Sequence, residues 1–331
     1  MEMRTFGRTG LQVSILGFGC GAVGGLMVRG APEDQERAVA RALEAGVNYF
    51  DTAAMYGNGE SEKNLGRVLA KLKPKVVVGT KVRIPSAEFG RIGAAVTQSL
   101  EASLRRMGRE QVDIFHLHNA ITTNGGGESL SAKTVLDEVV PAFEKLRDQG
   151  KLRFLGITAV GDTPALHQVI DSRAFTSAQV SYNMLNPSAA EALAAGYPAQ
   201  DYGRMFDHTQ AAGVGVVGIR VLAGGALSGA AERHPIASPP PDPIGSANSY
   251  DADLARARRL APLVQQGHAG SLAEAAVRFA ITNKAMGTIL VGMATHAEFE
   301  QALAAVDKGP LPQTALDSLA ALQRGFAGET R

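Results

Sequence analysis

The sequence contains very little cysteine and no tryptophan. Its 331 residues include one cysteine, Cys20, and aromatic residues make up only 5% of the chain. A lone cysteine cannot form an internal disulfide, which excludes the class of small extracellular proteins that disulfides stabilise. The first ten residues, MEMRTFGRTG, also lack the apolar stretch of a secretion signal. We therefore expect a cytoplasmic protein.

The chain has almost no net charge. Lysine and arginine number 33 against 32 aspartate and glutamate residues, which gives +1 at pH 7. Without an overall basic field, neither nucleic acid nor an anionic membrane is expected as a partner, and no apolar run reaches the roughly 18 residues of a membrane-spanning helix. The seven histidines and Cys20 show no H-x-x-x-H or C-x-x-C spacing, so no metal site is predicted. We expect a small-molecule partner, and the sequence leaves the oligomeric state open.

What the sequence does contain is a regular alternation of apolar runs and helical patterns. Each run is followed by a gap long enough for a helix and a loop, for example Pro32–Ala45 and Ala94–Met107. This rhythm is typical of a parallel sheet covered by helices, and eight units are what a closed (β/α)8 barrel, or TIM barrel, requires. The eight runs are Val13–Leu16, Val47–Phe50, Val76–Val78, Val112–Phe115, Leu152–Ile157, Ser177–Val180, Val214–Ile219 and Thr288–Val291.

A doubly wound open sheet is the alternative architecture. Gly17, Gly19 and Gly21 follow the first run, but the full G-x-G-x-x-G turn and the acidic residue about 20 positions later are missing. The missing fingerprint favours the barrel.

The remaining segments complete the predicted organisation. Met3–Ser14, with Gly7 and Gly10 in its middle, predicts a small β-hairpin that lies before the first barrel strand and closes the barrel floor. Asn119–Ser131 and Ser228–Ser249 show neither helical nor strand pattern, and long loops of this kind often carry function. No linker divides the chain, so we predict a single domain over residues 1–331.

Polar side chains close three consecutive runs of the predicted barrel. Asp51, Lys81 and His118 end the second, third and fourth runs, and Tyr56 follows Asp51 by five residues. In a parallel barrel these strand ends emerge on one face, where barrel enzymes place their chemistry, so the four residues are expected to converge. His116 would point to the same side of the strand as His118, and the spacing alone does not choose between them.

Side chains of these types can act as acid–base catalysts when a carbonyl group is reduced by a hydride. The ammonium of Lys81 would favour the ionised form of Tyr56, lower its pKa and make it a proton donor, while Asp51 would keep Lys81 charged. A histidine would donate a hydrogen bond to the carbonyl oxygen. No side chain supplies a hydride, which implies a nicotinamide or flavin cofactor.

Several motifs resemble those of the aldo-keto reductase family over nearly the whole chain. Phe6–Ser14 is similar to the opening hairpin of that family, and Asn48–Gly57 with Glu60–Gly66 is similar to its most specific signature. Ser103–Gly108 and Val112–His118 resemble the helix and strand that lead to the catalytic histidine of the family. The resemblance implies a (β/α)8 barrel and selects His118 over His116. It makes Asp51, Tyr56, Lys81 and His118 the catalytic residues.

The same resemblance implies a pyridine dinucleotide bound at the carboxyl ends of the strands. Gln179 matches the glutamine that holds the nicotinamide carboxamide, and glycines after Arg220 resemble a loop around the pyrophosphate. Two positions depart from the family, since Ala159 replaces an asparagine and Ile219 replaces a stacking aromatic residue. The implied cofactor-binding residues are Thr158, Gln179, Arg220, Leu222, Gly224, Gly225, Gly292 and Thr295.

The sequence gives conflicting signals about which dinucleotide binds. Resemblance to the family favours NADPH, whose 2′-phosphate is held by basic residues. The last signature, Val291–Glu300, lacks those residues and places Glu298 where like charge would oppose the phosphate, which favours NADH. Arg278 or Lys284 could supply the missing charge from elsewhere. NADPH is therefore expected, with NADH as the alternative.

The sequence supports three functional hypotheses. The first is an NAD(P)H-dependent oxidoreductase that reduces the carbonyl of an aldehyde, ketone or sugar, with Tyr56 as general acid. The second is an NAD-dependent sugar dehydrogenase, which runs the same chemistry in reverse. The third is a nucleotide-sensing regulatory subunit, similar to the β-subunits of potassium channels. Nothing in the sequence identifies the substrate itself.

Overall fold

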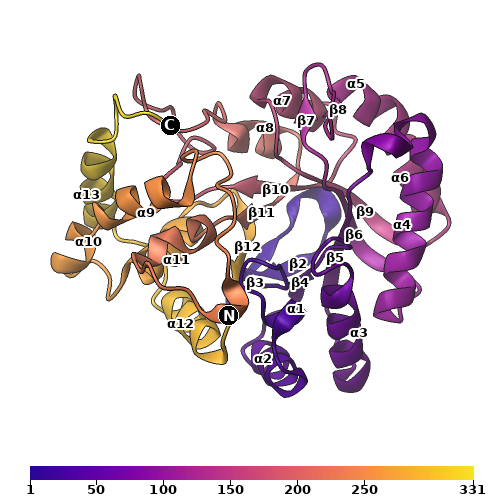
Figure 1. Cartoon of the computed structure of the whole chain (residues 1–331), viewed down its shortest axis with the longest axis horizontal. Helices are drawn as coiled ribbons and strands as arrows, with labels where there is room; N and C mark the ends of the chain where they lie inside the picture. Colours follow the sequence, from indigo (N-terminus) through magenta and orange to yellow (C-terminus); the bar gives the residue numbers. More distant parts are fainter.

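The computed structural model, which describes all residues 1–331, forms a closed barrel of eight parallel strands (Figure 1). Around the barrel the strands follow the order β10-β11-β12-β3-β4-β5-β6-β9, so neighbours in the chain are neighbours in space. The predicted TIM barrel is confirmed. The strands are β3 Leu16–Gly19, β4 Tyr49–Asp51, β5 Val77–Val82, β6 Val112–Leu117, β9 Leu152–Thr158, β10 Ser177–Ser181, β11 Gly215–Ile219 and β12 Met286–Gly292.

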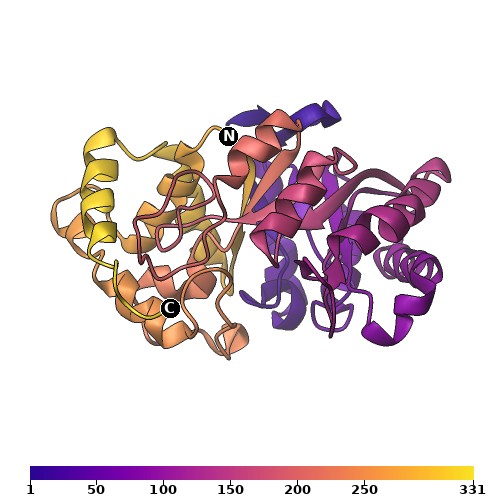
Figure 2. The ribbon, with the colours of Figure 1, turned by 90° about the horizontal axis from the view of Figure 1, so that it is seen from above.

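Helices surround the barrel and cover the apolar outer face of the strands (Figure 1). The helices that follow β11, from α9 to α13, gather on one side of the molecule (Figure 2). None of the helices is both long and apolar enough to cross a membrane. The helices are α1 Leu26–Arg29, α2 Pro32–Glu44, α3 Glu60–Leu72, α4 Ile92–Met107, α5 Ala132–Thr134, α6 Val140–Asp148, α7 Thr163–Asp171, α8 Met205–Ala211, α9 Tyr250–Arg258, α10 Pro262–Gln265, α11 Leu272–Thr282, α12 His296–Asp307 and α13 Gln313–Arg324.

Local sequence signals explain where several helices begin and end. α2 begins at Pro32, whose fixed φ suits the first helical position. The Ser271 hydroxyl accepts the Glu274 N–H at the start of α11, and the Thr295 hydroxyl accepts the Glu298 N–H at the start of α12. α4 ends at Met107 and is followed by Gly108, which adopts a left-handed conformation with φ of +62°.

The position of the first predicted barrel strand was wrong. Val13–Leu16 is not one strand, because the chain bends at Ile15. β2, Gln12–Ser14, pairs with β1, Met3–Thr5, as the second arm of a hairpin, and the barrel strand begins only at Leu16. The Ser14 hydroxyl donates to the Leu16 carbonyl at 2.7 Å and stabilises this bend. The bend contains neither glycine nor proline, and Ser14 is its only residue of a type common in turns.

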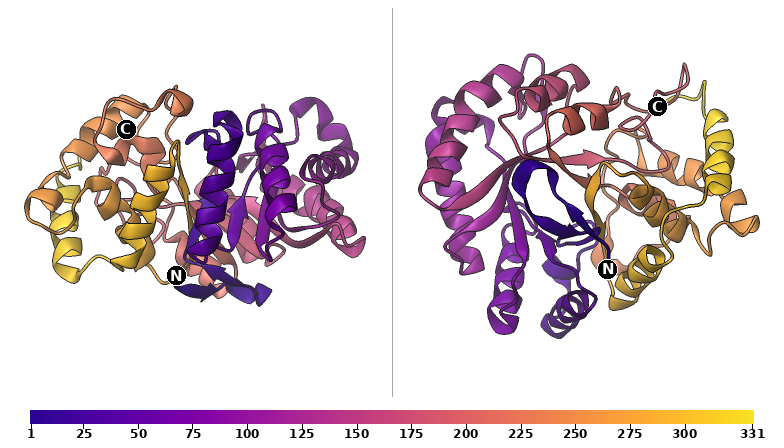
Figure 3. Two further views of the ribbon diagram at one scale, coloured as in Figure 1. Left: turned by 90° about the horizontal axis from the view of Figure 1, so that it is seen from below. Right: turned by 180° about the vertical axis from the view of Figure 1, so that it is seen from behind.

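The hairpin lies across the amino-terminal end of the barrel (Figure 3). Phe6 between its two strands is fully buried in a small cluster with Tyr49, Val77 and Ile114. A Cβ built on Gly215, at the start of β11, would lie 2.7 Å from the Phe6 ring, so the absence of a side chain there makes room for it. The structure therefore places the hairpin at the barrel floor, opposite the end at which the chemistry is expected.

The two segments without a sequence pattern differ in structure. Within Asn119–Ser131 two short strands, β7 Ile121–Thr122 and β8 Leu130–Ser131, form a small parallel pair that the sequence did not predict. Ser228–Ser249 is mostly irregular, with a single 3-10 turn at Pro235–Ala237. Both loops lie at the carboxyl end of the barrel.

Candidate active site

The four polar residues predicted to converge come from three adjacent strands. Asp51 is the last residue of β4, Lys81 is near the end of β5, and His118 directly follows β6. β4 pairs with β5 and β5 with β6, so these side chains lie at one sector of the barrel mouth. Tyr56 lies in the turn between β4 and α3.

Lys81 connects this group. Its Nζ donates to the Tyr56 hydroxyl at 3.1 Å, to the carbonyl oxygen of Thr52 at 2.8 Å and to Oδ2 of Asp51. The side chains of Lys81 and Asp51 are 0% and 3% exposed, so the ion pair is shielded from water. The His118 ring lies edge-on to the Tyr56 ring, with centroids 5.9 Å apart. The structure thus brings all four predicted residues together.

Burial controls the protonation of these groups. Burial raises the pKa of the Tyr56 hydroxyl above its usual value, and the ammonium of Lys81 offsets this only in part. This result overturns the expected lowering of the Tyr56 pKa, because the sequence could not show how deeply the phenol is buried. Burial also opposes the charged form of Lys81, but the neighbouring Asp51 and Tyr56 oxygens outweigh it and raise its pKa. At neutral pH the site therefore holds a protonated tyrosine beside a charged lysine.

The structure distinguishes His116 from His118, which the sequence spacing could not do. His116 is fully buried inside the barrel, where its Nε2 is 2.9 Å from the Ser177 hydroxyl, and it does not line the cavity at the barrel mouth. His118 lines that cavity, and its buried Nδ1 has no hydrogen-bond partner. Burial, with the charges of Lys81 and Arg83, lowers the pKa of His118 to about 3, so its imidazole is neutral. A neutral imidazole still has one N–H to donate.

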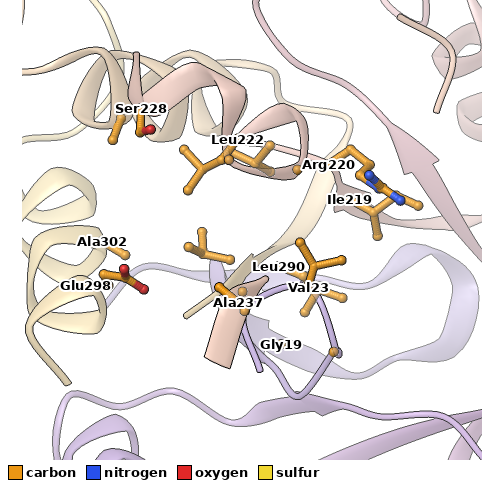
Figure 4. A pocket seen from close by; sticks show the side chains of 18 of the residues that line it. Gly19, Val23, Ile219, Arg220, Leu222, Ser228, Ala237, Leu290, Glu298 and Ala302 are labelled. Atoms are coloured by element: carbon orange, nitrogen blue, oxygen red, sulfur yellow. The ribbon is translucent and has the colours of Figure 1, made fainter. Parts of the chain in front are cut away.

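A cavity of about 850 Å³ opens from this group toward α12. Ile219 and Arg220 lie at one end of the cavity, and Glu298 lies at the other (Figure 4). Tyr56 and His118 also line the cavity. Between Arg220 and Glu298 the cavity passes the ends of β3, β11 and β12. Its size is within the range of small-molecule and cofactor sites.

Comparison with known proteins agrees with this geometry. The model of the aldo/keto reductase family matches residues 15–324. The chain belongs to the aldo-keto reductase family. It is 30% identical over 314 residues to an L-galactose dehydrogenase from Arabidopsis thaliana, covering 92% of this chain and 88% of that one. It is 28% identical over 243 residues to an L-glyceraldehyde 3-phosphate reductase from Escherichia coli, covering 69% of this chain and 64% of the relative.

A solved structure supports the fold of this aldo-keto reductase. An aldo-keto reductase from Bacillus halodurans, in its holo form, superimposes with a TM-score of 0.72 at 24% sequence identity. The match covers 97% of this chain and 96% of that one. At this identity the likeness establishes the shared barrel.

Aldo-keto reductases use NAD(P)H, and most residues predicted to hold it line the cavity. Thr295 is the exception, because it caps α12, accepts the Glu298 N–H at 3.2 Å and does not line the cavity. The lining residues of the predicted set are Thr158, Gln179, Arg220, Leu222, Gly224, Gly225 and Gly292.

Two features of the cavity fit a dinucleotide. The Thr158 hydroxyl is buried, has no hydrogen-bond partner and belongs to a lining residue, which leaves it free for a carboxamide. Gly224 and Gly225 have positive φ angles of +68° and +109°, which glycine adopts without strain. Their backbone can therefore approach a phosphate closely. Nearby, the Gln179 amide donates to Oδ1 of Asp51 at 2.6 Å and is tied to the Lys81 pair.

The structure also shows one lining residue, Arg233, that the sequence analysis did not identify. Arg233, in the irregular loop after β11, lines the cavity and donates to the carbonyls of Gly224 at 2.8 Å and Ala237 at 2.9 Å. The nitrogen that donates to Ala237 is also 3.4 Å from the carbonyl oxygen of Val23, in the loop after β3. These bonds join the loops on the two sides of the cavity. No motif could have revealed this role, since Arg233 acts through backbone carbonyls.

The far end of the cavity carries negative charge. Glu298 lines it, and the Glu298 carboxylate accepts the Ala294 N–H at 2.6 Å, which fixes its position. Arg278 and Lys284, the two basic residues considered for this end, do not line the cavity. Arg278 is engaged with backbone carbonyls and with Glu274, and Lys284 lies at the barrel floor.

Proposed function

We propose that this aldo-keto reductase is an NAD(P)H-dependent oxidoreductase that reduces the carbonyl of an aldehyde, ketone or sugar and oxidises the corresponding alcohol in reverse. The observation that carries the proposal is the Tyr56 hydroxyl, 3.1 Å from the Lys81 ammonium at the end of a cavity large enough for a dinucleotide and a small substrate. Nicotinamide, when bound, supplies the hydride.

The four side chains have distinct roles in this scheme. Tyr56 gives its proton to the carbonyl oxygen, and the Lys81 ammonium stabilises the phenolate that remains. Asp51 keeps Lys81 charged in a site where burial alone would favour the neutral amine. The neutral imidazole of His118 donates a hydrogen bond that positions the carbonyl oxygen. The raised pKa of Tyr56 suits a donor, because the phenol keeps its proton until the substrate takes it.

We further propose that NADH binds better than NADPH, in contrast to the expectation from family resemblance. If nicotinamide binds near Tyr56, the adenosine of an extended dinucleotide would lie toward Glu298, at the end of the cavity opposite Arg220 (Figure 4). A 2′-phosphate there would meet a like charge that is held in place. The lining cations Arg83 and Arg220 lie near the opposite end, and Arg233 is engaged with backbone carbonyls.

The names of the relatives narrow the substrate. One relative is named for a sugar, L-galactose, and another for a phosphorylated aldehyde. We therefore propose a small polar carbonyl compound or the corresponding alcohol as substrate, which includes the sugar dehydrogenase alternative.

Replacing Tyr56 by phenylalanine tests the proposal. The loss of NADH or NADPH absorbance is followed with a panel of aldehydes and sugars, and Y56F is expected to lower kcat by roughly 10²–10⁴-fold. Y197F is the matched control, because the Tyr197 hydroxyl donates to the Leu185 carbonyl away from the cavity. An unchanged kcat in Y56F would refute the assigned proton donor. Slow wild-type turnover with tight cofactor retention would instead favour the nucleotide-sensing subunit.

A further inference from the structure

Arg83 lies across the barrel mouth from the dinucleotide sector. It follows β5 directly, whereas the cavity toward Glu298 runs along the ends of β11, β12 and β3. β5 and its neighbour β6 carry Lys81 and His118. A group bound by Arg83 therefore lies beyond the reacting carbonyl, on the side away from the cofactor phosphates.

Arg83 is exposed to solvent where it lines the cavity, and its guanidinium makes no hydrogen bond or ion pair with the protein. Glu128 in the following loop feels the Arg83 charge, which adds to the lowering of its pKa after the Ser86 hydrogen bonds, but its carboxylate is bonded to the Ser86 hydroxyl at 2.6 Å and the Ser86 N–H at 3.4 Å and makes no ion pair with Arg83. The Arg83 charge also contributes to the low pKa of His118, after burial and Lys81, which shows that it acts on the reacting end of the cavity.

A second arginine lies at the same end without an ion pair. Arg220 donates to the backbone carbonyl of Asp242 at 3.0 Å, and its own carbonyl accepts the Asn183 amide at 2.9 Å. Arg220 has φ of +57°, an uncommon conformation for a residue with a side chain. Among the lining residues at this end, Arg83 and Arg220 carry positive charge beside the Lys81–Asp51 pair, and Asp242 carries negative charge.

The other side chains at this end are mostly apolar. Apart from the acid–base group, and from Thr158 and Gln179, which are proposed to hold the nicotinamide, the polar side chains here are those of Arg83, Arg220 and Asp242. Recognition of a neutral polyol would require several fixed amide or carboxylate partners for its hydroxyls. Free guanidinium groups instead match carboxylate or phosphate geometry. The apolar lining residues are Met55, Val160, Ile219, Pro243 and Ile244.

We propose that the substrate carries an anionic group, a carboxylate or a phosphate, separated from its carbonyl carbon, and that Arg83 binds this group. The inference rests on the proposed oxidoreductase function and specifies its substrate class. Arg220 adds to the positive potential at this end and remains available to the dinucleotide. The predicted preference is for the anionic member of any pair of aldehydes with the same carbon skeleton.

Two substrate pairs test the proposal and distinguish the two anions. 4-Formylbenzoate is compared with its methyl ester, and glyceraldehyde 3-phosphate with glyceraldehyde, at saturating cofactor. A charge-assisted pair is worth roughly a tenfold to hundredfold change, so kcat/KM should favour one or both anions by at least about tenfold, chiefly through KM. A preference confined to one pair identifies the anion, and a preference in neither pair overturns the proposal.

Variants of Arg83 test whether this residue causes the preference for anionic substrates. R83Q is expected to reduce the ratio of anionic to neutral kcat/KM to near one, and R83K to retain part of it through charge alone. R109Q removes a half-buried arginine whose one hydrogen bond is to the Gln111 carbonyl outside the cavity, and it should keep the wild-type ratio. A ratio that stays at its wild-type value in R83Q refutes the assignment. If the enzyme reduces neutral and anionic aldehydes equally well, the anionic-substrate proposal is refuted and the oxidoreductase function stands. If no carbonyl compound is turned over, the oxidoreductase function itself is refuted.

Discussion

Replacing Lys81 by methionine removes the ammonium from a buried ion pair. Lys81 and Asp51 are each almost fully shielded from water, and the remaining partner of the Asp51 carboxylate is the Gln179 amide at 2.6 Å. In K81M the carboxylate must stay charged in a dry site or take up a proton. The neighbouring Thr52 carbonyl and Tyr56 hydroxyl also lose their partner. We expect a large loss of stability as well as a loss of activity.

The magnitude follows from the cost of an unpaired buried charge. Removing one partner of a buried ion pair typically costs about 3–5 kcal/mol, whereas removing both partners is often close to neutral. K81M is therefore expected to lower the free energy of unfolding by about 3–5 kcal/mol. The double variant D51N/K81M, which leaves no charge, should recover most of this loss. Both variants should lack activity, because the phenolate of Tyr56 loses its stabilising ammonium.

Urea unfolding followed by circular dichroism and tyrosine fluorescence measures this difference. K133M is the control, since the Lys133–Asp137 pair is 84% and 55% exposed and its loss should leave the midpoint unchanged. If K81M is as stable as the wild type, the ion pair is not buried in solution as described. If D51N/K81M is less stable than K81M, the unpaired carboxylate is not the cause of the loss.

Three further predictions concern other parts of the molecule. His118 has a pKa of about 3 in the fold against about 6.5 when free, so its contribution to stability is present above pH 6.5 and is lost as the pH falls. Between pH 7.5 and pH 5, urea unfolding of H118Q should therefore lose about 2 kcal/mol less stability than the wild type, and equal losses would contradict the low pKa. E298K should shift the ratio of NADPH to NADH affinity toward NADPH by roughly tenfold at low salt, measured by cofactor fluorescence, and no shift would place the adenosine elsewhere. F6A should lower the free energy of unfolding by about 3–5 kcal/mol, and wild-type stability would mean that the hairpin does not close the floor.

The sequence was sufficient to predict the architecture and the convergence of the polar residues that we propose act in acid–base chemistry. Apolar runs that recur once per strand–helix unit predict a parallel barrel. The carboxyl ends of its parallel strands lie at the same end of the barrel whatever the details of packing. Asp51, Lys81 and His118 follow from that rule. The bend between β2 and β3 was missed because Val13, Ile15 and Leu16 are all apolar and a single serine among them is a weak turn signal.

Only the tertiary structure determined the chemical state of these residues and the surroundings of the cofactor cavity. The pKa of Tyr56 depends on how completely it is buried, which local sequence does not encode, and the expected direction was therefore wrong. Arg233, Glu298 and Arg83 lie far apart in the chain and acquire their roles through which cavity wall they line and which partners they find or lack. Strand periodicity fixes the direction in which a side chain points, whereas burial and charge pairing arise from contacts between distant segments.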